Sequence, residues 1–219
     1  MGDFPTTRDI AAGYDVAARQ YTDEFADELD RKPFDRELLT RFAAATAGRG
    51  PVADVGCGPA HIAGFLAARG VDVCGIDLST EMVAIARSRY PTIPFVAGNM
   101  VALGLRRGAL AGITAFYSLI HLPRDLVGTA LAELRRVLRP DGRLLLAVHG
   151  GEGEVHRDSW YDRPVKMAAT LFPRDDLLRD IAGAGFVVEE SVTRPPYDFE
   201  YQSERVYVLS RVDARPADA

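Results

Sequence analysis

The sequence predicts an α/β fold with one seven-stranded, mostly parallel sheet, an antiparallel edge strand and helices on both faces. Strand-like and helix-like segments alternate along the chain, which is the pattern of a parallel sheet covered by crossover helices. One apolar run also ends in a glycine turn that opens a helix. The chain has 219 residues, of which 47% are hydrophobic, enough for one full core. We therefore predict a Rossmann-like single domain over residues 1–212, followed by a disordered polar tail at 213–219.

Local signals place each element in order. Apolar and β-branched runs predict seven strands, which begin at Val52 and then cover 71–76, 93–97, 112–119, 143–149, 186–192 and 205–211. Apolar residues at helical spacing predict helices over 9–29, from Phe34, after the glycine turn, behind Ser79 as an N-cap, over 124–139 and over 173–182. Only a short excursion separates the last two strands, so they can return antiparallel at the edge of the sheet.

The glycine turn indicates a site for a nucleoside cofactor. Gly56 and Gly58 leave room for a ligand against the main chain, while Cys57 between them offers its backbone. The first turn of the following helix directs N–H groups at the same place. Asp54 adds a carboxylate, which favours a cationic ligand over a pyrophosphate. Asp77 ends the second strand about 20 residues after the glycines, which is the spacing of an acid that binds ribose hydroxyls.

These residues resemble the class I S-adenosylmethionine-dependent methyltransferases of the small-molecule type, whose first motif reads acid-x-Gly-x-Gly-x-Gly. The likeness is strong over 51–148. Ala60 stands at the third glycine, and Asn99 stands where the family commonly has an Asp that binds the adenine amino group. The resemblance implies S-adenosyl-L-methionine as the cofactor. It implies a cofactor site made of Tyr14, Tyr21, Asp54, Gly56, Cys57, Gly58, Asp77, Leu78, Met82, Asn99, Met100 and Tyr117.

The N-terminal segment 1–32 resembles the helical lid of small-molecule methyltransferases. In that resemblance Tyr14 and Tyr21 fold over the cofactor, exclude water and offer a hydroxyl near its methionyl carboxylate or sulfonium. The residues alone also fit an amphipathic helix whose tyrosines pack on the sheet. Tyr21 is the stronger candidate of the two for a role in the reaction.

Residues able to contact an acceptor gather in loops after the later strands, where ligands of open α/β sheets bind. The insert at 150–172 is longer than a plain connection and is assigned to the acceptor side. The candidate substrate-binding residues are His121, His149, His156, Trp160, Tyr161, Tyr197 and Tyr201. His121 and His149 are candidate general bases for a weakly acidic hydroxyl, although either also fits a structural role. Positioning of the two reactants alone could suffice for methyl transfer.

A metal site is the weaker interpretation of the same insert. His149, Glu152, Glu154, His156 and Asp158 are ligand types that suit a divalent ion. Their spacing matches no fixed template, and such clusters on loops are usually solvated. We therefore predict no metal.

Composition and charge limit the partners. A net charge of −5 disfavours nucleic acid, because such proteins need a basic face. No apolar run is long enough for a bilayer, and the N-terminus lacks a basic-then-apolar signal. We predict a cytoplasmic monomer or homodimer with a small-molecule acceptor and no membrane partner. Cys57 and Cys74 are expected to be free thiols.

The sequence thus predicts methyl transfer from S-adenosylmethionine to an oxygen or nitrogen of a small-molecule metabolite. One alternative is a protein that binds this cofactor without methyl transfer, either a sensor or a catalyst of rearrangement. Another is an NAD(P)-dependent oxidoreductase, which Asp54 and Ala60 disfavour. Turnover of the cofactor would separate the first reading from the second.

Overall fold

The computed structural model describes residues 3–213, which include Asp213 but none of the remaining predicted tail. The described chain divides into two compact units. The first unit contains the residues up to Asn99 and the segment His156–Ala168, and the second contains Met100–Val155 and the chain from Ala169 on. Among the described residues, no helix combines the length and the apolar character needed to cross a bilayer.

The first unit carries three strands of the main sheet and the N-terminal helices. Its strands are β1 (Val52–Val55), β2 (Val73–Asp77) and β3 (Phe95–Ala97), and β2 pairs in parallel with both neighbours. Its helical elements are α1 (Thr7–Phe25), the 3₁₀ helix η1 (Glu28–Arg31), α2 (Pro33–Thr46), α3 (His61–Ala67) and α4 (Thr80–Arg89). Helix α3 packs on β1 and β2, while α4 packs on β2, β3 and α1. All residues of β1 are buried, as expected of a parallel strand covered on both faces.

Two helices of this unit begin at side-chain caps. At α1 the Thr6 hydroxyl accepts a hydrogen bond from the Asp9 amide (3.2 Å), and the Asp9 carboxylate accepts one from the Thr6 amide (2.9 Å). At α4 the Ser79 hydroxyl accepts from the Met82 amide at 3.1 Å, which confirms the predicted N-cap. The helical region predicted at 9–29 divides into α1 and η1.

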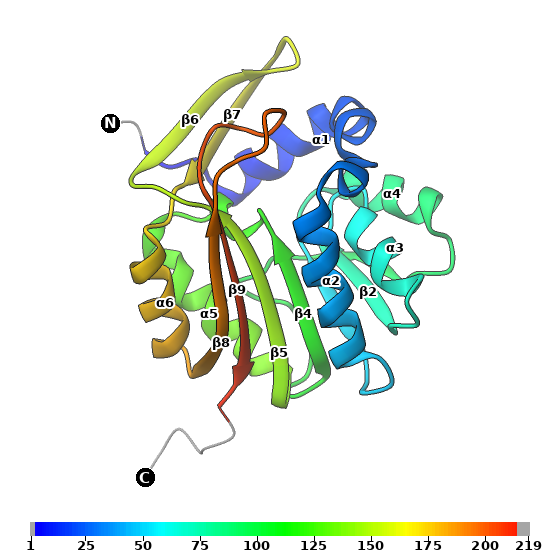
Figure 1. Ribbon diagram of the computed structural model, residues 1–219. Helices are drawn as coiled ribbons and strands as arrows, with labels where there is room; N and C mark the ends of the chain where they lie inside the picture. Colours follow the sequence, from blue (N-terminus) through cyan, green and yellow to red (C-terminus); the bar gives the residue numbers. More distant parts are fainter. Residues whose placement is uncertain (1–2, 214–219) are drawn as a thin grey trace. The chain divides into compact units, whose positions relative to one another are not determined.

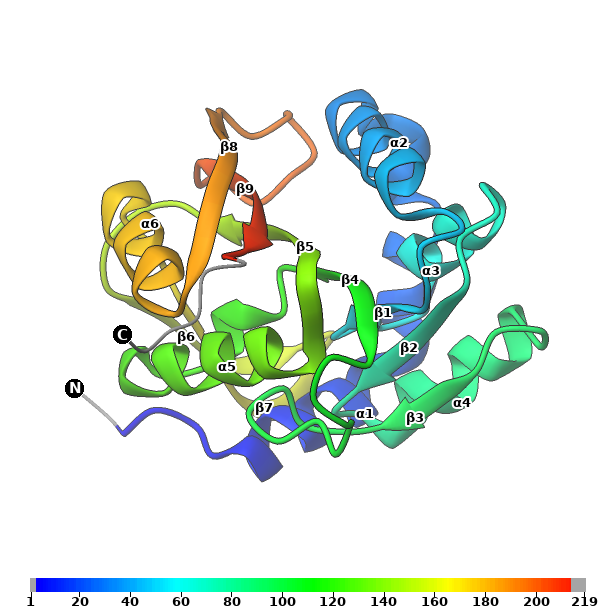
Figure 2. The same ribbon diagram turned by 90° about the horizontal axis from the view of Figure 1, so that it is seen from below.

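The second unit carries the other strands of the main sheet. They are β4 (Leu110–Phe116), β5 (Leu138–His149), β8 (Phe186–Arg194) and β9 (Arg205–Val212). Strand β4 pairs in parallel with β5, whereas β9 runs antiparallel to both β5 and β8. The helical elements are the 3₁₀ helix η2 (Leu119–His121), α5 (Arg124–Val137) and α6 (Arg174–Gly183). Helix α6 packs on β8 (Figure 1) and α5 packs on β5 and α6 (Figure 2).

The sheet follows the order β3-β2-β1-β4-β5-β9-β8. This confirms the predicted seven-stranded, mostly parallel α/β fold. The antiparallel element is at the predicted edge, where the reversed strand β9 lies between β5 and the edge strand β8.

The insert predicted at 150–172 contains a separate two-stranded sheet made of β6 (Glu154–Trp160) and β7 (Arg163–Thr170). Tyr161 and Asp162 connect the strands with φ values of 49° and 56°. Two such residues in succession are typical of a tight type I′ hairpin turn. The sequence analysis predicted no strands here. Strand β6 is mostly polar and almost wholly exposed, so it lacks the alternation of buried and exposed residues that marks a strand in a sequence.

Candidate functional site

The glycine turn after β1 is fixed by hydrogen bonds to the next strand. The Gly56 amide donates to the Ile76 carbonyl at 2.7 Å, and the Cys57 amide donates to the same oxygen at 3.2 Å. Gly56 and Gly58 have φ values of 76° and 50°, in the left-handed region that glycine adopts without steric cost. The turn therefore brings the Gly58 amide to the end of β2, where it donates to Asp77 Oδ2 at 2.7 Å.

Asp77 is the centre of the candidate cofactor site. Its Oδ1 accepts from the Ser79 amide at 2.8 Å, so each carboxylate oxygen accepts from at least one backbone amide. Burial raises the pKa of Asp77, against the hydrogen bonds from Ser79, Gly58 and Leu78, which lower it. The carboxylate oxygens can accept from further donors besides these amides. Two neighbouring hydroxyls of a ribose fit this arrangement at the carboxyl end of the strand.

Other predicted cofactor residues belong to the same unit as Asp77. Asp54 is 1% exposed within β1. Asn99 follows β3, directly after Gly98, whose amide donates to the Asp77 carbonyl at 2.8 Å. Met82 is buried in the first turn of α4, where its amide donates to the Ser79 hydroxyl.

Alanine at position 60, where the family pattern has a glycine, has a conformational cost besides its extra methyl group. It precedes α3 with a φ of 67°, in the left-handed region. That conformation costs an L-residue roughly 1–2 kcal/mol. The turn thus retains the glycine-like geometry with a residue that is strained in it.

Helix α1 is attached to the end of β2 by Asp15. One oxygen of this carboxylate accepts from the Ser79 hydroxyl (2.5 Å) and from the Glu81 amide (3.2 Å). Asp15 therefore links α1 to the first turn of α4, directly after Asp77. The sequence analysis did not single out Asp15, although it stands next to Tyr14 in the segment that resembles a lid.

An aromatic cluster joins α1 to the β6–β7 hairpin. Tyr14, Tyr21 and Trp160 lie edge to face in all three pairs, with ring centroids 5.2–5.6 Å apart. Trp160 stacks on Tyr161, whose hydroxyl donates to Glu24 Oε2 at 2.5 Å. The structure thus brings two residues predicted for the acceptor side, Trp160 and Tyr161, together with the predicted lid tyrosines.

Tyr21 lies over the glycine turn. A Cβ atom built on Gly58 would be 3.9 Å from Cε1 of the Tyr21 ring. Burial raises the pKa of Tyr14 and Tyr21 well above the usual value, and the charge of Asp77 adds to the effect. Both phenols therefore stay protonated at neutral pH. They can donate hydrogen bonds and present ring faces to a cation, but neither is a base.

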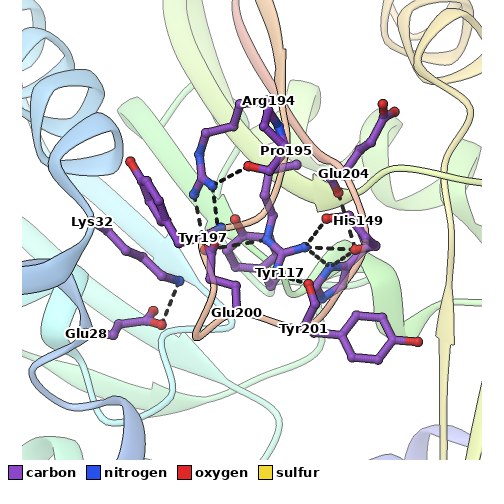
Figure 3. Close-up of polar contacts among 12 residues, drawn as sticks. Glu28, Lys32, Tyr117, His149, Arg194, Pro195, Tyr197, Glu200, Tyr201 and Glu204 are labelled. Atoms are coloured by element: carbon purple, nitrogen blue, oxygen red, sulfur yellow. Dashed lines mark hydrogen bonds and ion pairs between the residues drawn. The ribbon is translucent and has the colours of Figure 1, made fainter.

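A buried polar cluster follows the same helix. Glu28 Oε2 lies 2.7 Å from Lys32 Nζ (Figure 3), and Glu28 Oε1 lies 3.0 Å from Nε2 of His61, the first residue of α3. Burial alone would raise the pKa of Glu28. The hydrogen bonds and charges of His61 and Lys32 outweigh burial and lower this pKa from 4.5 to about 2. The sequence analysis assigned no cofactor-binding or catalytic role to these three residues.

The lowered pKa of Glu28 predicts an acid-sensitive contribution to stability. Because the ionised form is favoured in the folded state, this contribution is complete above pH 4.5 and is lost as the pH falls toward 2. We expect a loss of up to roughly 3 kcal/mol over this window. Denaturant unfolding at several pH values should show a shallower pH dependence for Glu28→Gln than for the wild type. Glu37→Gln removes an exposed carboxylate instead, so it should keep the wild-type slope; equal slopes in all three proteins would contradict the prediction.

A second group of predicted residues lies at the ends of β4 and β5 in the second unit. Tyr117 directly follows β4 with a φ of 51°, and His149 is the last residue of β5. Their ring centroids are 5.0 Å apart, and the Tyr201 ring lies 5.5 Å from that of His149. Tyr117 and His149 are partly exposed.

Behind these rings is a buried ion cluster (Figure 3). Arg194 binds Glu200 with two nitrogens, at 2.7 and 3.1 Å, and Arg205 Nε lies 3.5 Å from the same carboxylate. The Tyr197 amide also donates to Glu200 at 2.8 Å, and Arg194 lies 4.0 Å over the centre of the Tyr197 ring. The side chains of Glu200 and Arg205 are only 2% and 3% exposed. The sequence analysis named Tyr197 and Tyr201 in this segment but did not predict the cluster.

The remaining predicted residues are dispersed. His121 is partly exposed in η2, and Met100 lies in a turn after β3; both belong to the second unit. His156 belongs to β6 in the first unit, where its ring meets that of Phe4 at 6.3 Å. Within residues 3–213, no three His, Cys, Asp or Glu side chains are grouped to hold a metal ion.

The parallel sheet, the glycine turn and the acid at the end of β2 define a protein of the nucleoside-cofactor-binding α/β class. A family model described as a methyltransferase domain matches residues 52–142. The malonyl-[acyl-carrier protein] O-methyltransferase of Pseudescherichia vulneris is 30% identical over 179 residues, which cover 81% of this chain and 68% of that protein. The chain belongs to the class I S-adenosylmethionine-dependent methyltransferases.

Two further similarities agree with this membership. The demethylmenaquinone methyltransferase of Beutenbergia cavernae is 34% identical over 142 residues, or 64% of this chain and 57% of that protein. The first curated relatives that the chain matches are longer, and it covers 54–58% of their lengths. A solved S-adenosylmethionine-dependent methyltransferase from Methanosarcina mazei has a TM-score of 0.69 at 17% identity, with 75% of this chain and 93% of that chain covered. The last likeness shows the fold alone.

Proposed function

We propose that this protein binds S-adenosylmethionine and transfers its methyl group to an oxygen or nitrogen of a small-molecule metabolite. The observation that carries the proposal is the Asp77 carboxylate, held by the Gly58 and Ser79 amides with the Tyr21 ring over the glycine turn. The candidate cofactor site offers a suitable partner for each of three parts of the cofactor: the ribose, the adenine and the sulfonium. Asp77 would accept from the ribose hydroxyls, and Asn99 would accept from the adenine amino group.

The residues of the first unit would orient the cofactor and keep water from it. The faces of Tyr14, Tyr21 and Trp160 suit a sulfonium, since aromatic rings attract cations. When bound, the cofactor supplies a methyl group already activated by positive sulfur. The protein's main contribution would then be positioning, for which effective molarities of about 10⁵ to 10⁸ M are known. His121 and His149 are the candidate bases where the acceptor is a weakly acidic hydroxyl.

The relatives support a small acceptor without identifying it. One is named as an O-methyltransferase for malonyl-[acyl-carrier protein], which favours oxygen as the methylated atom. The net charge of −5 supports a small molecule rather than nucleic acid as the partner. Two free thiols, Cys57 and Cys74, are consistent with the reducing cytoplasm, and we propose a monomer or homodimer there.

The first test is thermal unfolding with S-adenosylmethionine, S-adenosylhomocysteine or NADH, each at about 100 times a plausible Kd. A ligand at this ratio stabilises by about 2.7 kcal/mol, so Tm should rise by roughly 5 to 10 °C with the two adenosyl compounds only. A rise with NADH alone would favour the oxidoreductase alternative. Formation of S-adenosylhomocysteine with an acceptor would then separate methyl transfer from cofactor binding without transfer.

A further inference from the structure

Strand β7 of the hairpin packs along the first half of helix α1. Lys166 Nζ lies 3.9 Å from Asp9 Oδ2, and a Cβ atom built on Gly13 would overlap the side chain of Met167. A glycine at this position therefore lets the strand approach the helix closely. The hairpin strands and α1 belong to the same compact unit, and these contacts join them directly.

The tip of the hairpin contacts the middle and the end of the same helix. The Trp160 ring lies edge to face against Tyr14 and Tyr21, with ring centroids 5.2 and 5.6 Å away. Tyr161 stacks on Trp160, and its hydroxyl donates to Glu24 Oε2 at 2.5 Å. Because the acceptor is a carboxylate, this bond belongs to the stronger, charge-assisted class. Tyr161 therefore fixes Trp160 against the two tyrosines of α1.

Tyr161 occupies a position in the turn that suits other residues better. Its φ of 49° is left-handed, and a type I′ turn favours Asn, Asp or Gly at its first central position. A tyrosine there adopts a conformation that L-residues other than Asn and Asp usually avoid. The side chain of Tyr161 nevertheless makes both contacts of the hairpin tip. This favours a role for the side chain itself over a role in forming the turn.

The tyrosines of α1 connect the hairpin to the candidate cofactor site. Tyr21 lies over the glycine turn, 3.9 Å from a Cβ atom built on Gly58. Burial is the main cause of the raised pKa of Tyr14; beyond it, the charge of Asp77 raises this pKa and the charge of Arg157 lowers it. Tyr14 is therefore within electrostatic range of both the end of β2 and strand β6.

The aromatic rings keep surface that their mutual packing does not cover. Tyr14, Tyr21 and Trp160 are each partly exposed, although all three contact one another. Aromatic faces attract cations and pack against apolar groups. In S-adenosylmethionine the sulfonium is flanked by methylene carbons, and we call this part the sulfur end of the cofactor. It matches the exposed ring surface in both respects.

We propose that Trp160 binds the sulfur end of the cofactor and that Tyr161 is a positioning residue, which holds Trp160 there through its bond to Glu24. The inference rests on the proposed function and adds two residues to its cofactor site. The sequence analysis named both as candidate contacts of the acceptor. The hairpin and α1 together form one cover over the sulfur end, so the cover slows the release of S-adenosylhomocysteine.

Quenching of fluorescence by acrylamide tests the contact of Trp160. This residue is the only tryptophan of the chain, so selectively excited indole emission comes from it alone. Bound S-adenosylhomocysteine should lower the quenching constant about twofold or more, because a ligand site encloses most of its ligand and the ring becomes covered. Adenosine keeps the adenine and the ribose but lacks the sulfur end, so it should leave the quenching constant nearly unchanged.

The rate at which S-adenosylhomocysteine dissociates tests Tyr161. Tyr161→Phe removes only the hydroxyl that donates to Glu24 and should raise this rate about three- to tenfold. Tyr161→Asn supplies a residue that the turn favours, yet it should raise the rate at least as much. A residue needed only for the turn would show no such loss. Tyr90→Phe removes a tyrosine hydroxyl elsewhere in the first unit and should keep the wild-type rate.

Glu24 completes a double-mutant cycle. Glu24→Ala should speed the release as much as Tyr161→Phe does, and the double variant should be no faster than either single variant, because all three lack the same bond. Glu24→Gln keeps a carbonyl oxygen that can accept from the hydroxyl. Its release rate should therefore fall between those of Glu24→Ala and the wild type.

Calorimetry in the same samples shows whether S-adenosylhomocysteine is bound. With the ligand bound, three results would each overturn the proposal: unchanged quenching of Trp160, an equal effect of adenosine, or a wild-type release rate in both Tyr161 variants. Additive effects of Tyr161→Phe and Glu24→Ala would overturn the positioning role of their bond. Failure of the wild type to bind S-adenosylhomocysteine would instead overturn the proposed function.

Discussion

Asp77→Ala is expected to lower the affinity for S-adenosylhomocysteine by at least about 100-fold. The substitution removes both oxygens that would accept from the ribose hydroxyls. A hydrogen bond to a charged group contributes about 1.5–3 kcal/mol, so two of them account for about 3–6 kcal/mol. Calorimetric titration of the variant and the wild type measures the loss directly.

Two further variants separate binding from local folding. The Gly58 and Ser79 amides also lose their acceptor in Asp77→Ala, so Asp77→Asn, which retains one carbonyl oxygen and the side-chain shape, should bind with an intermediate affinity. Asp72→Asn alters an exposed carboxylate just before the same strand and should bind like the wild type. Unchanged affinity in a folded Asp77→Ala protein would remove Asp77 from the cofactor site.

The cofactor turn could be predicted from the sequence because its determinants are local. Gly56 and Gly58 are needed where the backbone turns with positive φ, and the Ser79 cap acts on an amide three residues away. The acid at the end of β2 follows from the length of one β–α–β unit. Such features depend on residues that are close in the sequence and have a characteristic spacing.

The contacts of α1 could not be predicted in the same way. Asp15 reaches Ser79 and Glu24 reaches Tyr161, at separations of 64 and 137 residues. A single sequence carries no periodic signal for such pairs. The same limit explains why the sequence did not reveal the contacts of Trp160 with Tyr14 and Tyr21.

The ion cluster shows a second limit of the sequence. Arg194, Glu200 and Arg205 read as ordinary charges in and around a surface loop, since such side chains are rarely buried. They become buried only because the segment between β8 and β9 folds back over the ends of those strands, with Glu200 bound from both sides. The composition of a loop does not specify that path.

Glu200→Ala is expected to lower the free energy of unfolding by about 3–5 kcal/mol, because it leaves two guanidiniums buried without their shared carboxylate. For a chain of this size the corresponding fall in Tm is roughly 6 to 20 °C. The loss should exceed the value of any single hydrogen bond, since the Tyr197 amide loses its acceptor as well. Denaturant unfolding followed by circular dichroism measures it.

The matched control is Glu189→Gln, which also removes a carboxylate that contacts two arginines. Glu189 binds Arg143 at 2.6 Å and Arg211 at 3.6 Å, but its side chain is 27% exposed. Solvent weakens such a pair, so the expected loss is within about 1 kcal/mol. If Glu200→Ala were equally mild, the cluster would not be what orders the loop.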